Sequence, residues 1–73
     1  MLKSHLKEYR AKLNMNQSEL AEKVGVTRQT IGFIEKGTIS PSITLVLKIC
    51  NVFQCKVEDL FELEDVANER TTV

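Results

Sequence analysis

The chain has 73 residues, of which 42% are hydrophobic and 27% are charged, and its formal net charge is zero. This length and composition fit one small globular domain and exclude a disordered chain. No apolar run approaches the ~18 residues that a membrane-spanning helix needs, and the N-terminus lacks the apolar core of a signal peptide, which predicts a cytoplasmic protein.

The charges are unevenly distributed along the chain. Residues 1–56 contain nine lysines and arginines against four glutamates, whereas residues 57–73 contain one arginine against six acidic residues. This asymmetry favours a basic working surface and an acidic end turned away from it, with a scatter of solvated charges as the alternative interpretation.

Metal ligands and catalytic groups are scarce. Cys50, Cys55 and the single histidine, His5, are too few for a zinc site, which normally gathers four such ligands in short paired spacings. The apolar surroundings of the two cysteines favour reduced, buried thiols over a disulfide. The sequence contains no catalytic Ser/His/Asp or Cys/His set and no glycine-rich phosphate loop. We therefore predict no enzyme activity, no metal and no cofactor.

Apolar residues at helical spacing predict a first helix over residues 3–13. Asn14 follows this helix and tolerates the left-handed conformation that closes helices. A second helix is predicted to begin after Asn16, which forms a capping box with Glu19. Gly25 is expected to end this helix, because glycine adopts a positive φ without strain.

A third helix is predicted to start after Thr27 and to end at Gly37. Ile31 and Ile34 share its inner face. The opposite face carries Arg28, Gln29, Gly32, Phe33 and Lys36. Because the connection to the second helix is so short, the two helices are expected to cross steeply.

The rest of the chain predicts two more helices and a short strand. Ser40 is expected to cap a fourth helix that has Pro41 at its first position and crosses the middle of the bundle. The segment KVEDLF (56–61) predicts a short fifth helix, and FELEDV (61–66) weakly indicates a strand. The predicted fold class is all-α, with five helices and a possible short C-terminal strand. Residues 67–73 are predicted to be a flexible tail.

The start of the third helix is polar and lacks an obvious role in a core: it carries Thr27, Arg28, Gln29 and Thr30. A helix of ~10–12 Å diameter fits the major groove of DNA, and a helix-turn-helix aims the first residues of its second helix at base edges. Arg28 offers a fork to guanine O6 and N7, and Gln29 pairs with adenine N6 and N7. The pattern predicts sequence-specific recognition of double-stranded DNA.

Two further residues on the same face fit this interpretation. Gly32 costs about 1 kcal/mol relative to alanine in an exposed helix, which makes sense where a DNA strand must come close. Phe33 has two interpretations of equal weight: contact with a thymine methyl group, or packing against the loop near Ile39.

These residues carry a resemblance to a known family. The segment from Leu6 to Phe61 resembles the DNA-binding domain of the lambdoid phage repressor and Cro family, also called the XRE family. NQSELAEKVGVTRQTIGFIEKG (16–37) carries the pattern of that family, and SPSITLVLKICNVFQCKVEDLF (40–61) is similar to its fourth and fifth helices. The motif RQTI…IEK…PS…L.LKI…ED.F is shared with short stand-alone members of the cytolysin repressor type. The resemblance implies a lambda-repressor-like fold and a transcriptional regulator, with a repressor as the leading expectation.

The resemblance also implies roles for individual residues. The base-reading residues are Thr27, Arg28, Gln29 and Phe33. The residues that contact the DNA backbone are Asn16, through its backbone amide, Gln17, Thr30, Lys36, Thr38, Ser40 and Ser42. The loop GTISPS carries no lysine or arginine, unlike that of many family members. Arg10 and Glu35 correspond to a partly buried structural ion pair.

Relatives of this type bind palindromic operators as two-fold homodimers, and the resemblance implies the same here. The apolar residues left over after the bundle is closed are Phe61, Leu63 and Val66, which predict a dimer interface with a short strand that pairs across the two-fold axis. The predicted DNA-binding domain, with this interface, covers residues 1–66. The alternative is that Phe61 closes the core of the monomer and that the tail is disordered.

A second function stays open at this stage: a protein-interaction module, for instance antitoxin-like, that keeps the same fold and binds a partner through the acidic end. The predicted partners of the leading hypothesis are a DNA operator and a second copy of the chain, without a membrane. The sequence does not identify an inducer or a protein antagonist.

Overall fold

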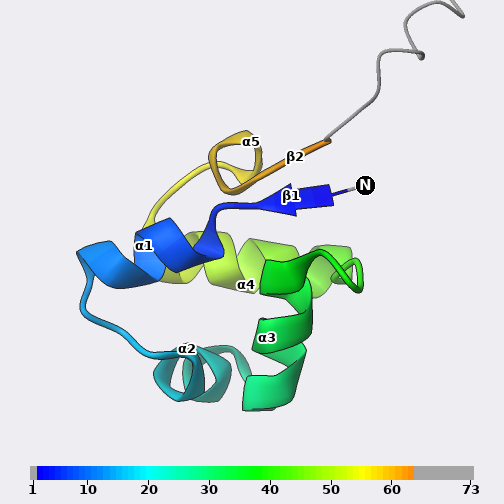
Figure 1. Cartoon of the computed structure of the whole chain (residues 1–73). Helices are drawn as coiled ribbons and strands as arrows, with labels where there is room; N and C mark the ends of the chain where they lie inside the picture. The colour runs from blue at the N-terminus through cyan, green and yellow to red at the C-terminus, as the bar shows by residue number, and fades with distance from the viewer. Residues whose placement is uncertain (1, 64–73) are drawn as a thin grey trace, which may run out of the picture.

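Five short helices and a two-stranded sheet are formed by residues 2–63, the part of the chain that the computed structural model describes (Figure 1). In chain order they are β1 (Leu2–Ser4), α1 (Leu6–Lys12), α2 (Gln17–Val24), α3 (Arg28–Lys36), α4 (Ile43–Phe53), α5 (Val57–Leu60) and β2 (Phe61–Leu63). The predicted five-helix class and the short strand after the fifth helix are confirmed. Val66 and the predicted tail at 67–73 lie outside the described residues. No helix in residues 2–63 has the length and apolar character needed to cross a membrane.

The N-terminal residues form β1, and the prediction that the first helix starts at residue 3 was wrong. β1 pairs with β2 in an antiparallel register: Leu2 with Leu63, Lys3 with Glu62 and Ser4 with Phe61. The side-chain oxygen of Ser4 then accepts a hydrogen bond of 3.0 Å from the backbone N–H of Leu6, at the start of α1. The helical spacing of apolar residues was misleading here, because the backbone N–H and C=O groups of residues 2–4 pair with β2, a segment far away along the chain.

His5 joins the two ends of the described chain. Its backbone N–H donates to the carbonyl of Leu60 at 2.9 Å. Its Nε2 lies 2.7 Å from a carboxylate oxygen of Glu62. This contact raises the pKa of His5 and lowers the pKa of Glu62, because each charged form stabilises the other. His5 thus links the end of β1 to the end of α5 and to β2.

The helix ends of the central segment follow local chemistry. Asn16 accepts a hydrogen bond from the backbone N–H of Glu19 at 2.8 Å, and the Glu19 side chain accepts from the backbone of Asn16, which completes the predicted capping box. Thr27 caps α3. Gly25 and Gly37 end α2 and α3 with φ of 78° and 76°. All these predictions are confirmed.

The start of α4 is a correction. Ser42, and not Ser40, is the capping residue, since its side-chain oxygen accepts a hydrogen bond of 3.2 Å from the backbone N–H of Leu45. Pro41 therefore precedes the helix instead of occupying its first position. The two serines flank the proline, and only the one directly before Ile43 can reach the free amide groups of the first turn.

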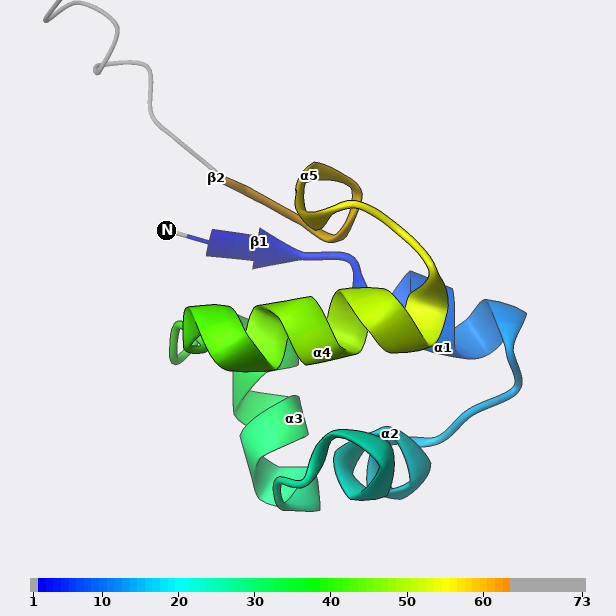
Figure 2. The same ribbon diagram turned by 180° about the vertical axis from the view of Figure 1, so that it is seen from behind.

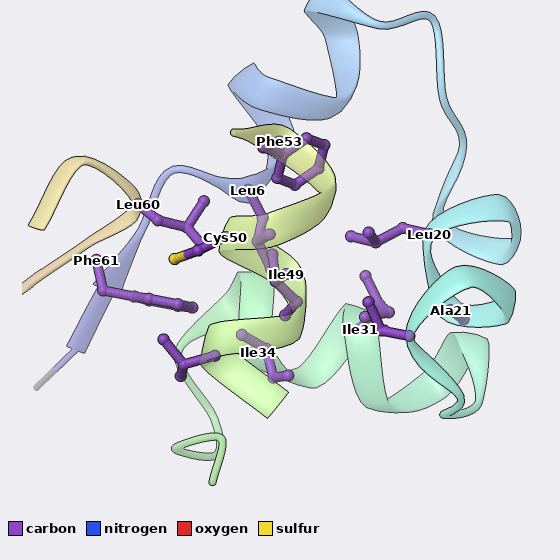
Figure 3. Close-up of a cluster of buried hydrophobic side chains, with 12 residues drawn as sticks. Leu6, Leu20, Ala21, Ile31, Ile34, Ile49, Cys50, Phe53, Leu60 and Phe61 are labelled. Atoms are coloured by element: carbon purple, nitrogen blue, oxygen red, sulfur yellow. The ribbon is translucent and has the colours of Figure 1, made fainter. Parts of the chain in front are cut away.

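The core surrounds α4, which runs across the middle of the molecule with the sheet and α5 on one side and α2 and α3 on the other (Figures 1 and 2). Side chains from all five helices meet there (Figure 3). Six of them are at most 1% exposed: Leu6, Leu20, Ile31, Ile34, Ile49 and Leu60. Because every helix contributes to one cluster, the position of α3 is fixed by the whole core.

Phe61 belongs to this core. Its side chain is only 6% exposed, so the interpretation in which it closes the monomer core is correct, and its predicted role in a dimer interface is not. The two cysteines are free thiols, with Cys50 buried and Cys55 partly buried. Burial raises the pKa of Cys50 to about 11, which keeps it a neutral thiol at physiological pH.

The corrected cap of α4 can be checked by substitution. We expect Ser42→Ala to lower the free energy of unfolding by about 1 kcal/mol, because the backbone N–H of Leu45 loses its partner. Urea unfolding followed by circular dichroism measures this change. Ser40→Ala is the matched control: Ser40 is exposed, and a substitution there should stay within ~0.5 kcal/mol of the wild type. A larger loss from Ser40→Ala than from Ser42→Ala contradicts the assignment.

Candidate nucleic-acid interface

The helix-turn-helix consists of α2, α3 and the three residues between them. Gly25 turns the chain in a left-handed conformation, and the backbone N–H of Val26 donates to the carbonyl of Ala21 at 3.0 Å. Thr27 then caps α3 by accepting a hydrogen bond of 3.2 Å from the backbone N–H of Thr30. As a result α3 crosses α2, and its first turn lies at the end of the molecule remote from the sheet (Figures 1 and 2).

The two faces of α3 have different roles. Ile31 and Ile34 are 0% and 1% exposed and face the core. Thr27, Arg28, Gln29 and Lys36 are exposed, and Thr30 and Gly32 are partly exposed. Phe33 leaves 40% of its surface exposed. Arg28, Gln29 and Phe33 therefore share one accessible face of α3, and Thr27 is exposed at the N-terminus of the helix.

A shallow hollow of about 260 Å³ lies on this face; its lining residues are Gln17, Arg28, Gln29, Gly32, Phe33 and Lys36. Gly32 lies next to Gln17 in this lining: a Cβ at position 32 would lie 3.8 Å from Gln17 Nε2. That distance is an ordinary contact, so the fold itself accepts alanine here. The close approach of a DNA strand to Gly32 stays a prediction.

The predicted ion pair between Arg10 and Glu35 is present. Arg10 Nε and one terminal nitrogen donate to the two carboxylate oxygens of Glu35 at 2.7 and 3.1 Å. The other terminal nitrogen donates to the carbonyl of Met15 at 3.0 Å. With side-chain exposures of 13% and 10%, the pair is largely shielded from water. It joins α1, the α1–α2 connection and α3.

Sequence reasoning missed how this pair continues to the surface. Gln17 Nε2 donates to Glu35 Oε1 at 2.9 Å, and Gln17 Oε1 accepts from a terminal nitrogen of Arg28 at 3.0 Å. A chain of hydrogen bonds therefore runs from the buried pair to the side chain that we predict to read guanine. The residues are too far apart in sequence, and on too many helices, for a spacing pattern to show it.

The predicted DNA-backbone residues fall into two groups. The first group is exposed: Lys36 lies on α3, and Thr38 and Ser40 lie in the loop between α3 and α4.

The second group is already engaged within the chain. Gln17 donates to Glu35 at 2.9 Å, and the hydroxyl of Thr30 lies 3.0 Å from that of Thr27 and bonds to it. The backbone N–H of Asn16 donates to Glu19 at 2.8 Å, so the predicted phosphate contact through that amide is corrected. The side-chain oxygen of Ser42 caps α4.

The predicted dimer residues are distributed differently. Leu63 is 77% exposed at the end of β2, whereas Phe61 is buried. Sequence reasoning did not identify the other strongly exposed apolar side chains, Ile43 and Leu47 on α4, at 66% and 55%. Most residues of α4 are apolar, so the sequence pattern does not distinguish its buried positions from its exposed ones.

The crossing of α2 and α3 and the accessible first turn of α3 define a helix-turn-helix DNA-binding domain of the kind found in transcriptional regulators. The helix-turn-helix family model matches residues 6–60, and the chain belongs to this family, in its XRE-type branch. The resemblance noted in the sequence is confirmed.

Similar proteins support the same class. The chain is 50% identical over 64 residues to an uncharacterized HTH-type transcriptional regulator of Archaeoglobus fulgidus, which covers 88% of this chain and 90% of that protein. It is 52% identical over 64 residues to the uncharacterized HTH-type transcriptional regulator YgzD of Bacillus subtilis, with 88% and 97% covered. Its fold is similar to that of the P22 c2 repressor in complex with a synthetic operator, with a TM-score of 0.69, 26% identity, and 73% of this chain and 80% of that chain covered. These relatives are regulators, which points away from an enzyme.

The ion pair predicts a large stability effect. We expect Arg10→Ala to lower the free energy of unfolding by ~3–5 kcal/mol, because the shielded carboxylate of Glu35 loses its cation. Thermal and urea unfolding measure the loss. Lys23→Ala, an exposed lysine on α2, is the control and should have little effect. Equal melting temperatures for Arg10→Ala and the wild type contradict a structural role for the pair.

Proposed function

We propose that this protein is a sequence-specific regulator, acting as a repressor, that binds a palindromic DNA operator as a homodimer with α3 in the major groove. The observation that carries the proposal is the accessible face of α3, where forked polar side chains surround the hollow at Gly32. A helix can read bases only if its side chains reach them without an obstruction. The similar P22 c2 repressor was crystallised with a synthetic operator, which supports the same mode of binding.

Base recognition falls to the first two turns of α3. Arg28 is placed to donate two hydrogen bonds to a guanine, and Gln29 to pair with an adenine. Gln29 is exposed and no residue within 2–63 makes a hydrogen bond to its side chain, so its amide is available. Thr27 lies at the entry to the groove. Phe33, at 40% exposure, presents an apolar surface to a thymine methyl group.

Contacts to the DNA backbone surround this reading face. Gln17 uses one of its two N–H hydrogens on Glu35 and keeps the second for a phosphate. Lys36 supplies a positive charge at the C-terminal end of α3, and Thr30, Thr38 and Ser40 supply hydroxyl groups. The start of α4 at Ser42 supplies a further phosphate contact. Such contacts position the protein without selecting a sequence.

A homodimer is needed because one helix reads only a few base pairs, too few to select one site among ~10⁶–10⁹ competitors. Side chains two residues apart on a strand lie on the same face, so Leu63 continues the face that buries Phe61. At 77% exposure, Leu63 extends beyond the edge of the monomer core. A second copy related by a two-fold axis would cover it. β2 pairs with β1 of its own chain along one edge, and no other strand of residues 2–63 pairs with its second edge, which leaves that edge for the short strand pairing across the two-fold axis.

Selection of binding sites from a random duplex pool tests the function. At ~150 mM salt, where non-specific phosphate binding is weak, we expect a palindromic consensus with half-sites about one helical turn apart. A guanine and an adenine should stand where Arg28 and Gln29 reach. Absence of any enriched sequence with a folded sample contradicts the proposal and shifts attention to the acidic end and a protein partner.

Two variants serve as controls for that selection. Arg28→Ala should lower affinity for the selected site by ~1–3 kcal/mol and relax the preference at one base pair of each half-site. Lys36→Ala should weaken binding to all sequences alike and reduce the salt dependence by about one phosphate contact. Both residues are exposed, so the fold should survive, which circular dichroism checks.

The interface is tested separately. We expect Leu63→Asp to be monomeric in sedimentation velocity, because a carboxylate would lose its water in the proposed contact. Leu13→Asp, at an apolar site that is 52% exposed at the end of α1, is the control and should remain dimeric. A Leu63→Asp variant that stays dimeric places the interface elsewhere.

A further inference from the structure

Gln17 holds a position between two charges of opposite sign. Its Nε2 lies 2.9 Å from the carboxylate of Glu35, and its Oε1 lies 3.0 Å from the guanidinium of Arg28. A carboxylate only accepts hydrogen bonds and a guanidinium only donates them. The Gln17 amide therefore has one satisfactory orientation, because turning it over would place oxygen against Glu35 and N–H against Arg28.

Glu35 is itself fixed. Both of its oxygens accept hydrogen bonds from Arg10, and its side chain is 10% exposed. An ion pair with two parallel hydrogen bonds holds the carboxylate in a defined plane. Glu35 thus presents one oxygen to Gln17 in a constant direction, and it sets which end of the amide faces the surface.

Arg28, in contrast, is an exposed, long side chain. Such a side chain loses rotamer freedom when it binds a base, which weakens binding unless it is already held in place. Its only hydrogen bond within residues 2–63 is to the Gln17 carbonyl, through one terminal nitrogen. The remaining N–H groups of the guanidinium stay available for the two acceptors of a guanine.

We propose that Glu35 is a positioning residue for base recognition: acting through the Gln17 amide, it holds the Arg28 guanidinium over the base that Arg28 reads. The inference rests on the proposed function and deepens it. It adds to the structural role of the ion pair, because the same carboxylate oxygen that accepts from Arg10 also orients the amide.

Glu35→Gln separates positioning from packing. The new amide keeps the shape of the side chain but has one acceptor and one donor end. Three donors, Arg10 Nε, a terminal nitrogen of Arg10 and Gln17 Nε2, then compete for one amide oxygen, and the new NH₂ group faces at least one of them. The fixed carboxylate that orients the Gln17 amide is thereby lost. The readout is base discrimination, the ratio of the dissociation constants for the selected operator and for the operator changed only at the pair under Arg28.

We expect Glu35→Gln to reduce this ratio by about fivefold or more, since the discrimination of one well-placed Arg–guanine pair is at stake. Discrimination at the pair under Gln29 should stay unchanged. Glu22→Gln, an exposed glutamate on α2, removes the same charge outside this hydrogen-bond chain and is the matched control. It should alter overall affinity through charge but leave both ratios intact.

Gln17→Met approaches the same contact from the other side and remains informative if Glu35→Gln fails to fold. It should reduce discrimination at the pair under Arg28 in the same way, and the double variant should show no further loss, because both substitutions break one chain of contacts. Full discrimination in either folded single variant, or additive losses in the double variant, overturns the inference. A wild-type protein without any sequence preference overturns the proposed function itself, a result distinct from the other two.

Discussion

Arg10 and Glu35 form the contact on which the helix-turn-helix depends, because α1, the α1–α2 connection and α3 meet there. Removing two charges from water costs free energy, and the cost is offset only where every donor and acceptor finds a partner. Most of these groups are partnered here: Arg10 donates to both oxygens of Glu35 and to the carbonyl of Met15, and Gln17 donates to Glu35 as well. Few other arrangements of these segments would satisfy the same groups, so the pair specifies how α3 sits on the domain.

The second constraint is that α3 must bury one face in the core and expose the opposite face to solvent. The helical repeat of 3.6 residues makes this possible, since Ile31 and Ile34 are buried while Arg28 and Gln29 are exposed. The crossing with α2 then decides where the outer face is directed. Gly25 makes the sharp turn with a positive φ, and the small, buried Ala21 on α2 leaves room for close packing.

Much of this arrangement could be predicted because its causes are local. Asn16, Thr27, Gly25 and Gly37 mark helix ends through contacts within four residues, which a sequence shows directly. The ion pair has no such local signal, because Arg10 and Glu35 lie 25 residues apart, and its prediction came from the family resemblance. Residues 2–4 could not be assigned in this way, because β1 exists only through β2. Phe61 was ambiguous for a related reason: whether an apolar residue near the end closes a core or leaves it depends on that pairing.

The hydrogen bonds of the exposed face of α3 determine which of its positions can change freely. Gln29 makes no side-chain hydrogen bond within residues 2–63, and Phe33 is 40% exposed, so under the proposed function other side chains at these positions should alter the bases preferred without disturbing the fold. Arg28 differs, because Gln17 Oε1 accepts from it. A glutamate at position 28 would place a carboxylate against the Gln17 oxygen, where only a donor is satisfied, and its negative charge would also be repelled by Glu35. A lysine at position 28 would keep a donor but lose the planar fork of arginine. The chemistry at position 28 is thus restricted to donors by a carboxylate that lies one layer below the surface.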